Sequence, residues 1–219
     1  MRQKSEDAGR DDGSVNTVEN LGIRAVEAPW DVIEHARASH YLLLANLFAR
    51  APTAALLRAA AKLMGDTSSL GMARLALADA AQTADPSVVA KEYLDLFIGV
   101  GRGDILPYGS FYLTGFLHER PLARVRDDMA RLAIERRGDV FEPEDHIASL
   151  FEVMAGLIGG TFAAPAGAAD KFFERHLAPW APRLMADVMV APSAKFYRSV
   201  AALGATWLEI EMEAMRLPE

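Results

Sequence analysis

Apolar side chains recur at helical spacing through most of the chain, and proline or glycine interrupts the pattern at intervals. Between Ile33 and Phe48, apolar residues return every three or four positions, and Ala51-Pro52 ends the run. No stretch alternates with the period of two that marks a strand. Alanine and leucine dominate, whereas β-branched residues are sparse, which favours helices. The sequence therefore predicts an all-α fold, a single helical bundle of about nine or ten helices.

Capping and helix-breaking residues set the expected boundaries. Asp31 and Glu34 have the spacing of a capping box, Thr53 can cap the second helix, and Asp85-Pro86 reads as the N-cap and first residue of another. Pro121 and Pro143 open two later helices. The expected helices cover residues 31–50, 54–64, 68–82, 87–98, 110–119, 122–137, 144–158, 171–180, 182–190 and 194–215.

Two regions differ from this pattern. Residues 1–28 are polar and of mixed charge, and are expected to form a disordered N-terminal tail. Residues 29–217 are expected to form one all-helical domain. Within it, the glycine-rich break at 99–110 and the linker at 159–169 leave room for two lobes.

Composition excludes several functions. A net charge of -7 argues against nucleic acid as a partner and favours a basic one. The chain has no cysteine, which excludes disulfides, thiolate metal sites and cysteine nucleophiles. The start of the chain lacks the apolar core of a secretory signal, and no uncharged run is long enough to span a membrane. A cytoplasmic protein is expected.

The stretch "GVGRGDILPYGSFYLTG" at residues 99–115 is the most unusual in the chain. It is not a dinucleotide fingerprint, because Asp104 stands where the third glycine belongs and a helix, not a strand, precedes it. A nest of backbone N–H groups that holds an anion stays open, as does a connection that needs positive φ at several glycines. The aromatic residues Tyr108, Phe111 and Tyr112 fit burial in the core and capture of a peptide equally well.

The remaining candidates for chemistry are weak. Glu144 and Asp145 follow Pro143 at an expected helix start, where they either favour the helix dipole or bind a guest peptide together with His146. The histidines have no i,i+4 pair, and Ser110 lacks the G-x-S-x-G context of a nucleophile. Neither a catalytic set nor a metal or cofactor site is predicted, and we expect a binding protein that is not an enzyme.

Three segments in order resemble the TorD-type (TorD/DmsD/NarJ-like) chaperones, the cytoplasmic maturation factors of bacterial molybdenum enzymes. They are "EYLDLFIGVGRGDILPYGSFYLTG", "EPEDHIASLFEVM" and "FFERHLAPWAPRLMADVMVAPSAKFYRSVAALGATWLEIE", and the likeness spans residues 30–212. The resemblance implies an all-helical bundle, monomeric or domain-swapped into a homodimer. It also implies binding, without catalysis, of the apo catalytic subunit of a DMSO-reductase-class molybdoenzyme and its twin-arginine leader before export. The form "GVGRG" favours a formate dehydrogenase client.

The resemblance carries client-binding roles onto matched motif positions. In the first motif these are Gly101, Gly103, Pro107, Tyr108, Ser110 and Tyr112, and in the second they are Glu144, Asp145 and His146. We hypothesise that the two motifs face each other across one groove. Tyr108 and Tyr112 would take the apolar part of the leader, and Glu144 and Asp145 would meet its arginines.

Two alternatives stay open at this point. One is a helical scaffold or regulatory protein with a different partner. The other is a guanine-nucleotide-binding protein that uses the loop at residues 99–104, since some members of the resembled family are reported to bind such nucleotides.

Overall fold

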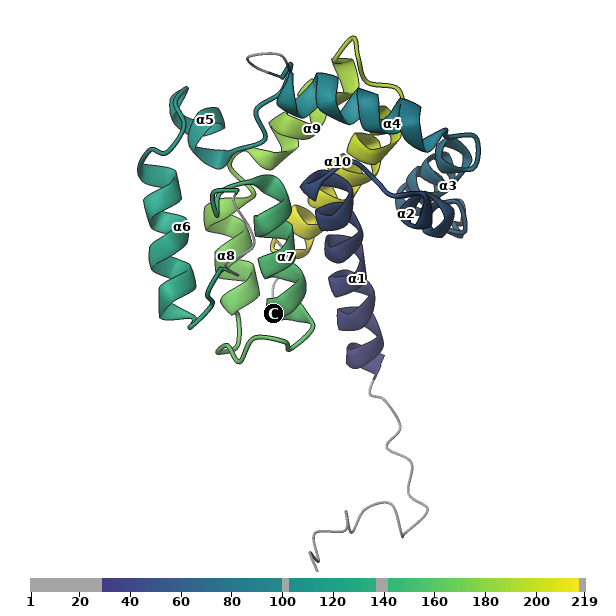
Figure 1. Cartoon of the computed structure of the whole chain (residues 1–219). Helices are drawn as coiled ribbons and strands as arrows, with labels where there is room; N and C mark the ends of the chain where they lie inside the picture. Colours follow the sequence, from purple (N-terminus) through teal and green to yellow (C-terminus); the bar gives the residue numbers. More distant parts are fainter. Residues whose placement is uncertain (1–28, 100–102, 137–141, 217–219) are drawn as a thin grey trace, which may run out of the picture.

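The computed structural model describes residues 29–99, 103–136 and 142–216, and within these ranges it is helical without a strand (Figure 1). An isolated antiparallel bridge joins Tyr108 to His146. The predicted all-α bundle is confirmed. The helices are α1 (Pro29–Ala49), α2 (Ala54–Ala60), α3 (Ser69–Gln82), α4 (Pro86–Tyr93), α5 (Gly109–Thr114), α6 (Arg120–Arg131), α7 (Ile147–Ile158), α8 (Ala168–His176), α9 (Ala181–Val190) and α10 (Phe196–Ala214), and the π-helical segment η2 (Leu94–Ile98) continues α4.

The centre of the bundle is formed by α1, α7 and α10. In Figure 1, α1 and α7 lie next to each other, α6 and α8 lie on one side, and α2 and α3 lie on the other. Aromatic rings from three helices meet in the core: Tyr41 lies 5.7 Å from Phe151, and Phe48 lies 6.1 Å from Tyr197, centroid to centroid. Helices far apart in the sequence are therefore fixed to one another by ring packing.

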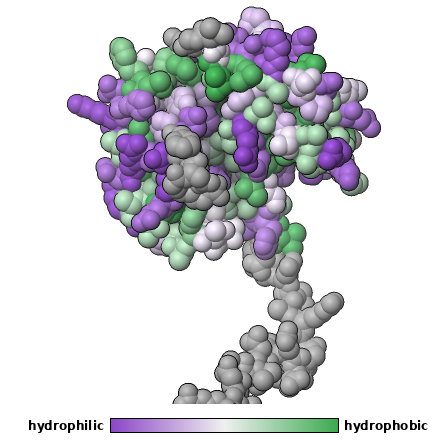
Figure 2. Space-filling view, in the orientation of Figure 1, coloured by the Kyte–Doolittle hydropathy of each residue, from purple (hydrophilic) through white to green (hydrophobic). Residues whose placement is uncertain are grey.

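Polar and apolar side chains are interspersed over most of the face in Figure 2. Hydrophobic side chains gather toward the top of this face, near α5 and α4. Exposed apolar residues of these elements and of η2 are Val88, Leu94, Ile98 and Leu113, and Phe116 follows α5. Among the described helices, none is long and apolar enough to cross a membrane.

Several predicted caps are confirmed, and several boundaries move. Thr53 accepts a hydrogen bond from the Leu56 amide at 3.2 Å, and Asp85 caps α4 with Pro86 following. However, α1 begins at Pro29, two residues before the capping box expected at Asp31. Gly115 (φ 84°) ends α5 after Thr114, in the left-handed conformation that glycine adopts readily.

Other expected boundaries were wrong. Apolar residues beyond a helix end, such as Leu63 and Ile134, continue the pattern because they still pack on the core. Helix α2 ends at Ala60 instead of residue 64, and α6 ends at Arg131. Helix α7 begins at Ile147, so Glu144 and Asp145 precede it instead of occupying its first turn. The predicted tail, residues 1–28, lies outside the described residues, and the division into tail and single domain stays a prediction.

A buried carboxylate connects α4 to the start of α10. Glu92 is 6% exposed and accepts hydrogen bonds from the backbone N–H groups of Lys195 (2.7 Å), Phe196 (3.1 Å) and Tyr197 (2.8 Å). These are amides that the first turn of a helix leaves unpaired. Because the carboxylate also complements the positive end of the helix dipole, Glu92 acts as an N-cap supplied from a distant helix.

We expect Glu92→Ala to lower the free energy of unfolding by about 2–4 kcal/mol, because it leaves buried amides of α10 without an acceptor. Urea unfolding followed by circular dichroism measures this. The control is Glu209→Ala, which removes an exposed carboxylate of α10. It should change the free energy of unfolding by less than about 0.5 kcal/mol. Equal effects of the two substitutions would contradict the capping role.

Candidate functional site

The two motifs singled out in the sequence are in direct contact. The Gly109 amide donates to the Asp145 carbonyl at 2.9 Å, and the Ile147 amide donates to the Pro107 carbonyl at 2.9 Å. Between them, the rings of Tyr108 and His146 meet edge to face with centroids 5.0 Å apart. We call residues 107–110 and 145–147 the motif junction. The expectation that the motifs would face each other across a groove is corrected: they are joined by backbone pairing.

Asp145 is the most deeply placed member of the motif junction. It is 1% exposed, and its Oδ2 accepts a hydrogen bond from the Ser110 amide at 2.7 Å, in the first turn of α5. Its Oδ1 and the Ser110 hydroxyl are also buried and have no partner among the described residues. The carboxylate is thus used within the fold. In this conformation it exposes almost no surface to guest arginines, and that contact stays a prediction.

His146 is the N-cap of α7. Its Nδ1 accepts a hydrogen bond from the Ala148 amide at 3.1 Å, which requires that nitrogen to be unprotonated. Burial lowers the pKa of His146 to about 4, although the nearby Glu142 and Asp145 carboxylates oppose this change. The neutral ring is therefore the form that belongs to the folded protein near neutral pH.

Tyr108 and Tyr112 are half-buried and hydrogen-bonded. The Tyr108 hydroxyl donates to Glu142 at 2.5 Å, and the Tyr112 hydroxyl donates to Asp187 at 2.9 Å. Burial, followed by these carboxylates, raises the pKa of both hydroxyls. The Tyr112 ring also packs on Trp180 at 5.4 Å. Of the two readings open for these aromatic residues, the structure shows packing, and peptide capture by them stays a prediction.

Close packing explains two of the described glycines of the first motif, Gly103 and Gly109. A Cβ at Gly103 would lie 2.6 Å from the Leu96 carbonyl oxygen, which is too close for any side chain. At Gly109 it would lie 3.1 Å from Nε1 of Trp180. The expectation of positive φ at several glycines holds for Gly99 (φ 60°) and Gly115 (φ 84°) but not for Gly103 or Gly109, and Gly101 lies outside the described residues.

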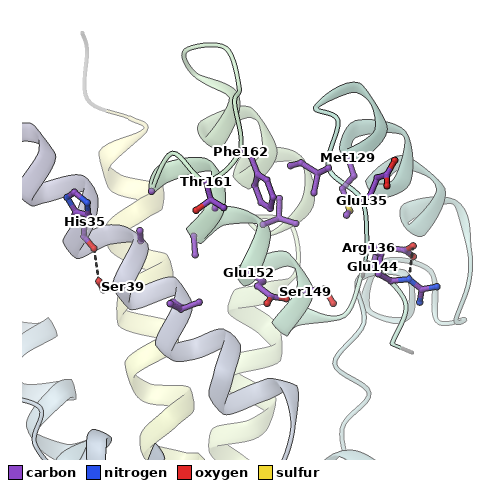
Figure 3. Close-up of a pocket in the computed structure, with 17 residues that line it drawn as sticks. His35, Ser39, Met129, Glu135, Arg136, Glu144, Ser149, Glu152, Thr161 and Phe162 are labelled. Atoms are coloured by element: carbon purple, nitrogen blue, oxygen red, sulfur yellow. Dashed lines mark hydrogen bonds and ion pairs between the residues drawn. The ribbon is translucent and has the colours of Figure 1, made fainter. Parts of the chain in front are cut away.

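Beside the motif junction is a cavity of about 460 Å³, which we call the α1–α7 groove (Figure 3). Its walls come from α1, α7, the end of α6, the segment between α6 and α7 and the segment after α7. In Figure 3, His35 and Ser39 of α1 lie across the groove from Phe162 and Met129. The lining residues are mainly apolar or small, and the larger apolar ones are Leu42, Met129, Ile134, Val153 and Phe162.

The charged residues of the groove are mostly acidic. Glu144 is held by Arg126 at 2.8 Å and lies 3.6 Å from Nε of Arg136. Glu135 and Glu152 are exposed and form no ion pair with a described residue. Three carboxylates and one arginine line the groove, a formal charge of -2 if His35 is neutral. An apolar hollow with an acidic rim suits a guest that is apolar and basic.

Sequence reasoning found Glu144 but missed the rest of the groove. Ser149, Glu152, Val153 and Gly156 have the i,i+3 and i,i+4 spacing that places them on one face of α7, and that signal was present. The contribution of α1 and of Phe162 could not be inferred, because it depends on how α1 packs on α7. Among the described residues, no group of three or more histidine and carboxylate side chains could hold a metal.

Comparison with known proteins agrees with the fold and the motifs. The model of the family described as the nitrate reductase delta subunit matches residues 65–186, more than half of the chain. The chain belongs to this family. The TorD-type membership expected from the motifs is thereby confirmed.

Individual relatives are distant. The chaperone protein TorD of Aliivibrio fischeri is 27% identical over 135 residues, which cover 57% of this chain and 63% of the relative. That of Vibrio atlanticus is 27% identical over 194 residues, covering 76% and 88%. A putative redox enzyme maturation protein from Archaeoglobus fulgidus has a similar fold, with a TM-score of 0.55 at 19% identity, covering 87% of this chain and 99% of that one.

The pKa of His146 predicts a pH dependence. Below pH 6.5 an unfolded histidine binds a proton that the folded ring, with a pKa of about 4, does not. The unfolded state therefore holds more protons in this window. The contribution of neutral His146 to the free energy of unfolding is complete above pH 6.5, and stability falls by up to about 3 kcal/mol as pH drops toward 4. Urea unfolding between pH 4 and 7 measures the slope.

The control for this effect is His146→Asn, which keeps an N-capping side chain but does not titrate. The free energy of unfolding of the variant should depend less steeply on pH than that of the parent across the same window. The difference corresponds to the uptake of up to one proton on unfolding. Identical slopes in the two proteins would mean that His146 does not exchange a proton with folding.

Proposed function

We propose that this protein is a cytoplasmic chaperone for the maturation of a redox enzyme. Its client would be the apo catalytic subunit of a DMSO-reductase-class molybdoenzyme, bound together with its twin-arginine leader before cofactor insertion and export. Family membership supports the general role, as do relatives named chaperone protein TorD. The chaperone acts by binding, and no catalytic step is assigned to it.

The observation that carries the leader-binding part is the α1–α7 groove. A leader of this class joins arginines to an apolar segment, and the groove joins an acidic rim to an apolar interior. Its volume of about 460 Å³ accommodates a few apolar side chains, not a whole leader. The apolar segment would enter between Leu42, Val153 and Phe162, and the arginines would meet Glu135 and Glu152, whose carboxylates have no other ion-pair partner in the described chain.

The motif residues have a different part in this proposal. Glu144 lines the groove, and its carboxylate would bind a guest arginine in addition to Arg126 and Arg136. Pro107, Tyr108, Ser110, Asp145 and His146 hold the start of α7, and so position one wall of the groove. They would influence client binding through that wall.

Two further residues of the first motif hold the segment around them in place. Gly103 packs against the Leu96 carbonyl, and the Tyr112 hydroxyl donates to Asp187.

The groove predicts which substitutions weaken leader binding. The test ligand is a synthetic peptide with two arginines followed by an apolar segment. We expect Glu152→Arg to lower the affinity for this peptide about tenfold, since one attraction becomes a repulsion. Glu209→Arg makes the same charge change on α10 and should leave affinity within about twofold. Isothermal titration calorimetry on the full chain measures both. If the parent does not bind the peptide, or both variants behave alike, the groove is not the leader site.

The client is identified by capture from the native cytoplasm. We expect the tagged protein, from molybdate-replete anaerobic cells, to retain a large molybdopterin-dependent subunit identified by mass spectrometry. Leu42→Asp should reduce that capture severalfold, because a charge in the apolar part of the groove excludes the leader. An unchanged melting temperature confirms that the variant is folded. A captured partner unrelated to molybdenum enzymes would support the scaffold alternative instead.

A further inference from the structure

A second groove, of opposite electrostatic character, lies between α6 and α8. Two adjoining cavities of about 400 and 670 Å³ share Arg131 and Arg175 in their linings. Arg124 lines the smaller cavity, and Lys171 lines the larger. We call the two cavities together the α6–α8 groove. None of its basic residues was singled out in the sequence.

A single carboxylate organises the basic side chains of this groove. Asp128, with a side chain 14% exposed, accepts hydrogen bonds from Nη1 of Arg175 at 3.1 and 2.8 Å and from Nη1 of Arg131. The ring of His176 lies against it at 2.7 Å. Arg131 and Arg175 each bind Asp128 through Nη1, and their other N–H groups form no hydrogen bond with a described residue. Each guanidinium group is anchored at one nitrogen, and its other donors can bind a guest.

Arg124 adds a cation that nothing in the described chain neutralises. It is exposed, and it forms no ion pair or hydrogen bond with a described residue. Burial lowers the pKa of the nearby His176 ring, and the charges of Arg175 and Arg124 add to this shift. Arg124 and Arg175 also both line a small inner cavity of about 20 Å³ that reaches Asp145 and Trp180. The basic groove therefore borders the motif junction on a side lined by α6 and α8.

The charge of the groove is weakly positive in a strongly acidic protein. Four cations (Arg124, Arg131, Lys171, Arg175) and three anions (Asp127, Asp128, Glu174) give a formal charge of +1, whereas the chain carries -7. Apolar residues complete the lining: Leu132, Pro165, Ala166 and Phe172. A small positive excess beside apolar surface fits single carboxylates on a segment with apolar neighbours better than a multiply charged phosphate.

We propose that the α6–α8 groove binds an acidic segment of a partner protein, with its carboxylates on Arg124, Arg131 and Arg175 and its apolar side chains against Leu132 and Phe172. The identification of this partner as the client rests on the function proposed above. The protein would then hold one client at two places of opposite sign: a basic, apolar segment in the α1–α7 groove and an acidic, apolar segment in the α6–α8 groove. Two weak sites on one chain raise the affinity for a guest that fills both.

The experiment uses the full-length, ¹⁵N-labelled protein and two synthetic peptides. One repeats Leu-Glu-Glu, and the other replaces each glutamate with glutamine. The NMR signals of the arginine Nε–H groups report directly on the guanidinium groups of the groove. We expect the glutamate peptide to shift the signals of Arg124, Arg131 and Arg175, with an affinity that falls as salt is raised. The glutamine peptide should leave them in place.

Matched variants test the assignment. Arg124→Gln should lower the affinity for the glutamate peptide about two- to fivefold. It should not lower the melting temperature, because Arg124 has no partner in the described fold. Arg58→Gln removes an exposed arginine of α2 and should have no effect. If the glutamate peptide shifts no arginine of the groove, or Arg58→Gln weakens binding as much as Arg124→Gln, the proposal is wrong.

Two further outcomes separate the alternatives. If pyrophosphate shifts the same arginines at lower concentration and displaces the peptide, the groove is a small-anion site and the acidic segment is not its ligand. The arginine-rich leader peptide is measured on the same samples. Leader binding without glutamate-peptide binding would reject only this inference, and the reverse result would reject the leader-binding function while leaving the α6–α8 groove in place.

Discussion

The pairing of residues 107–110 with 145–147 is the contact on which the functional half of the fold depends. It connects α5 to α7 across a long stretch of sequence through two backbone hydrogen bonds and the Asp145 carboxylate. Because α7 packs along α1, this connection also fixes one wall of the α1–α7 groove. A buried carboxylate stabilises a structure only when its surroundings hold it in place. Here the Ser110 amide binds one oxygen of Asp145, while the other oxygen has no partner among the described residues.

Helix α6 separates two surfaces of opposite sign. Met129 of α6 lines the acidic, apolar groove, while Arg124 and Arg131 of the same helix line the basic groove beside α8. Asp128 and Glu144 each gather two arginines, so both grooves are edged by ion pairs that link α6 to a neighbouring element. These exposed pairs add little stability singly. The charges left without an ion-pair partner in the described chain are Glu135 and Glu152 at one groove and Arg124 and Lys171 at the other.

The helices were predictable from the sequence because each depends on signals close to it. Thr53 and Asp85-Pro86 identified true helix starts from a few neighbouring residues. The cap of α10 was not predictable, because Glu92 lies more than a hundred residues before the amides that it binds. The same limit explains Glu144 and Asp145. Their position after a proline indicates a first helical turn, and only the pairing with Pro107 and Gly109 shows that α7 starts later.

The candidate site contains residues of two kinds, those that hold the fold together and those that line the open groove. The sequence motifs located the residues that hold α5, α7 and Trp180 together: Gly103 and Gly109 are small because neighbouring atoms approach them, and His146 caps a helix. Residues with such roles are set by the fold, so they indicate a family without indicating what it binds. Glu135 and Glu152 line the open groove, are exposed and have no ion-pair partner in the described chain, so the fold constrains them less. If the groove binds the leader, the choice of client is encoded in residues of this second kind. A chain could then change its client while keeping both motifs, which is why "GVGRG" alone is weak evidence for a particular enzyme.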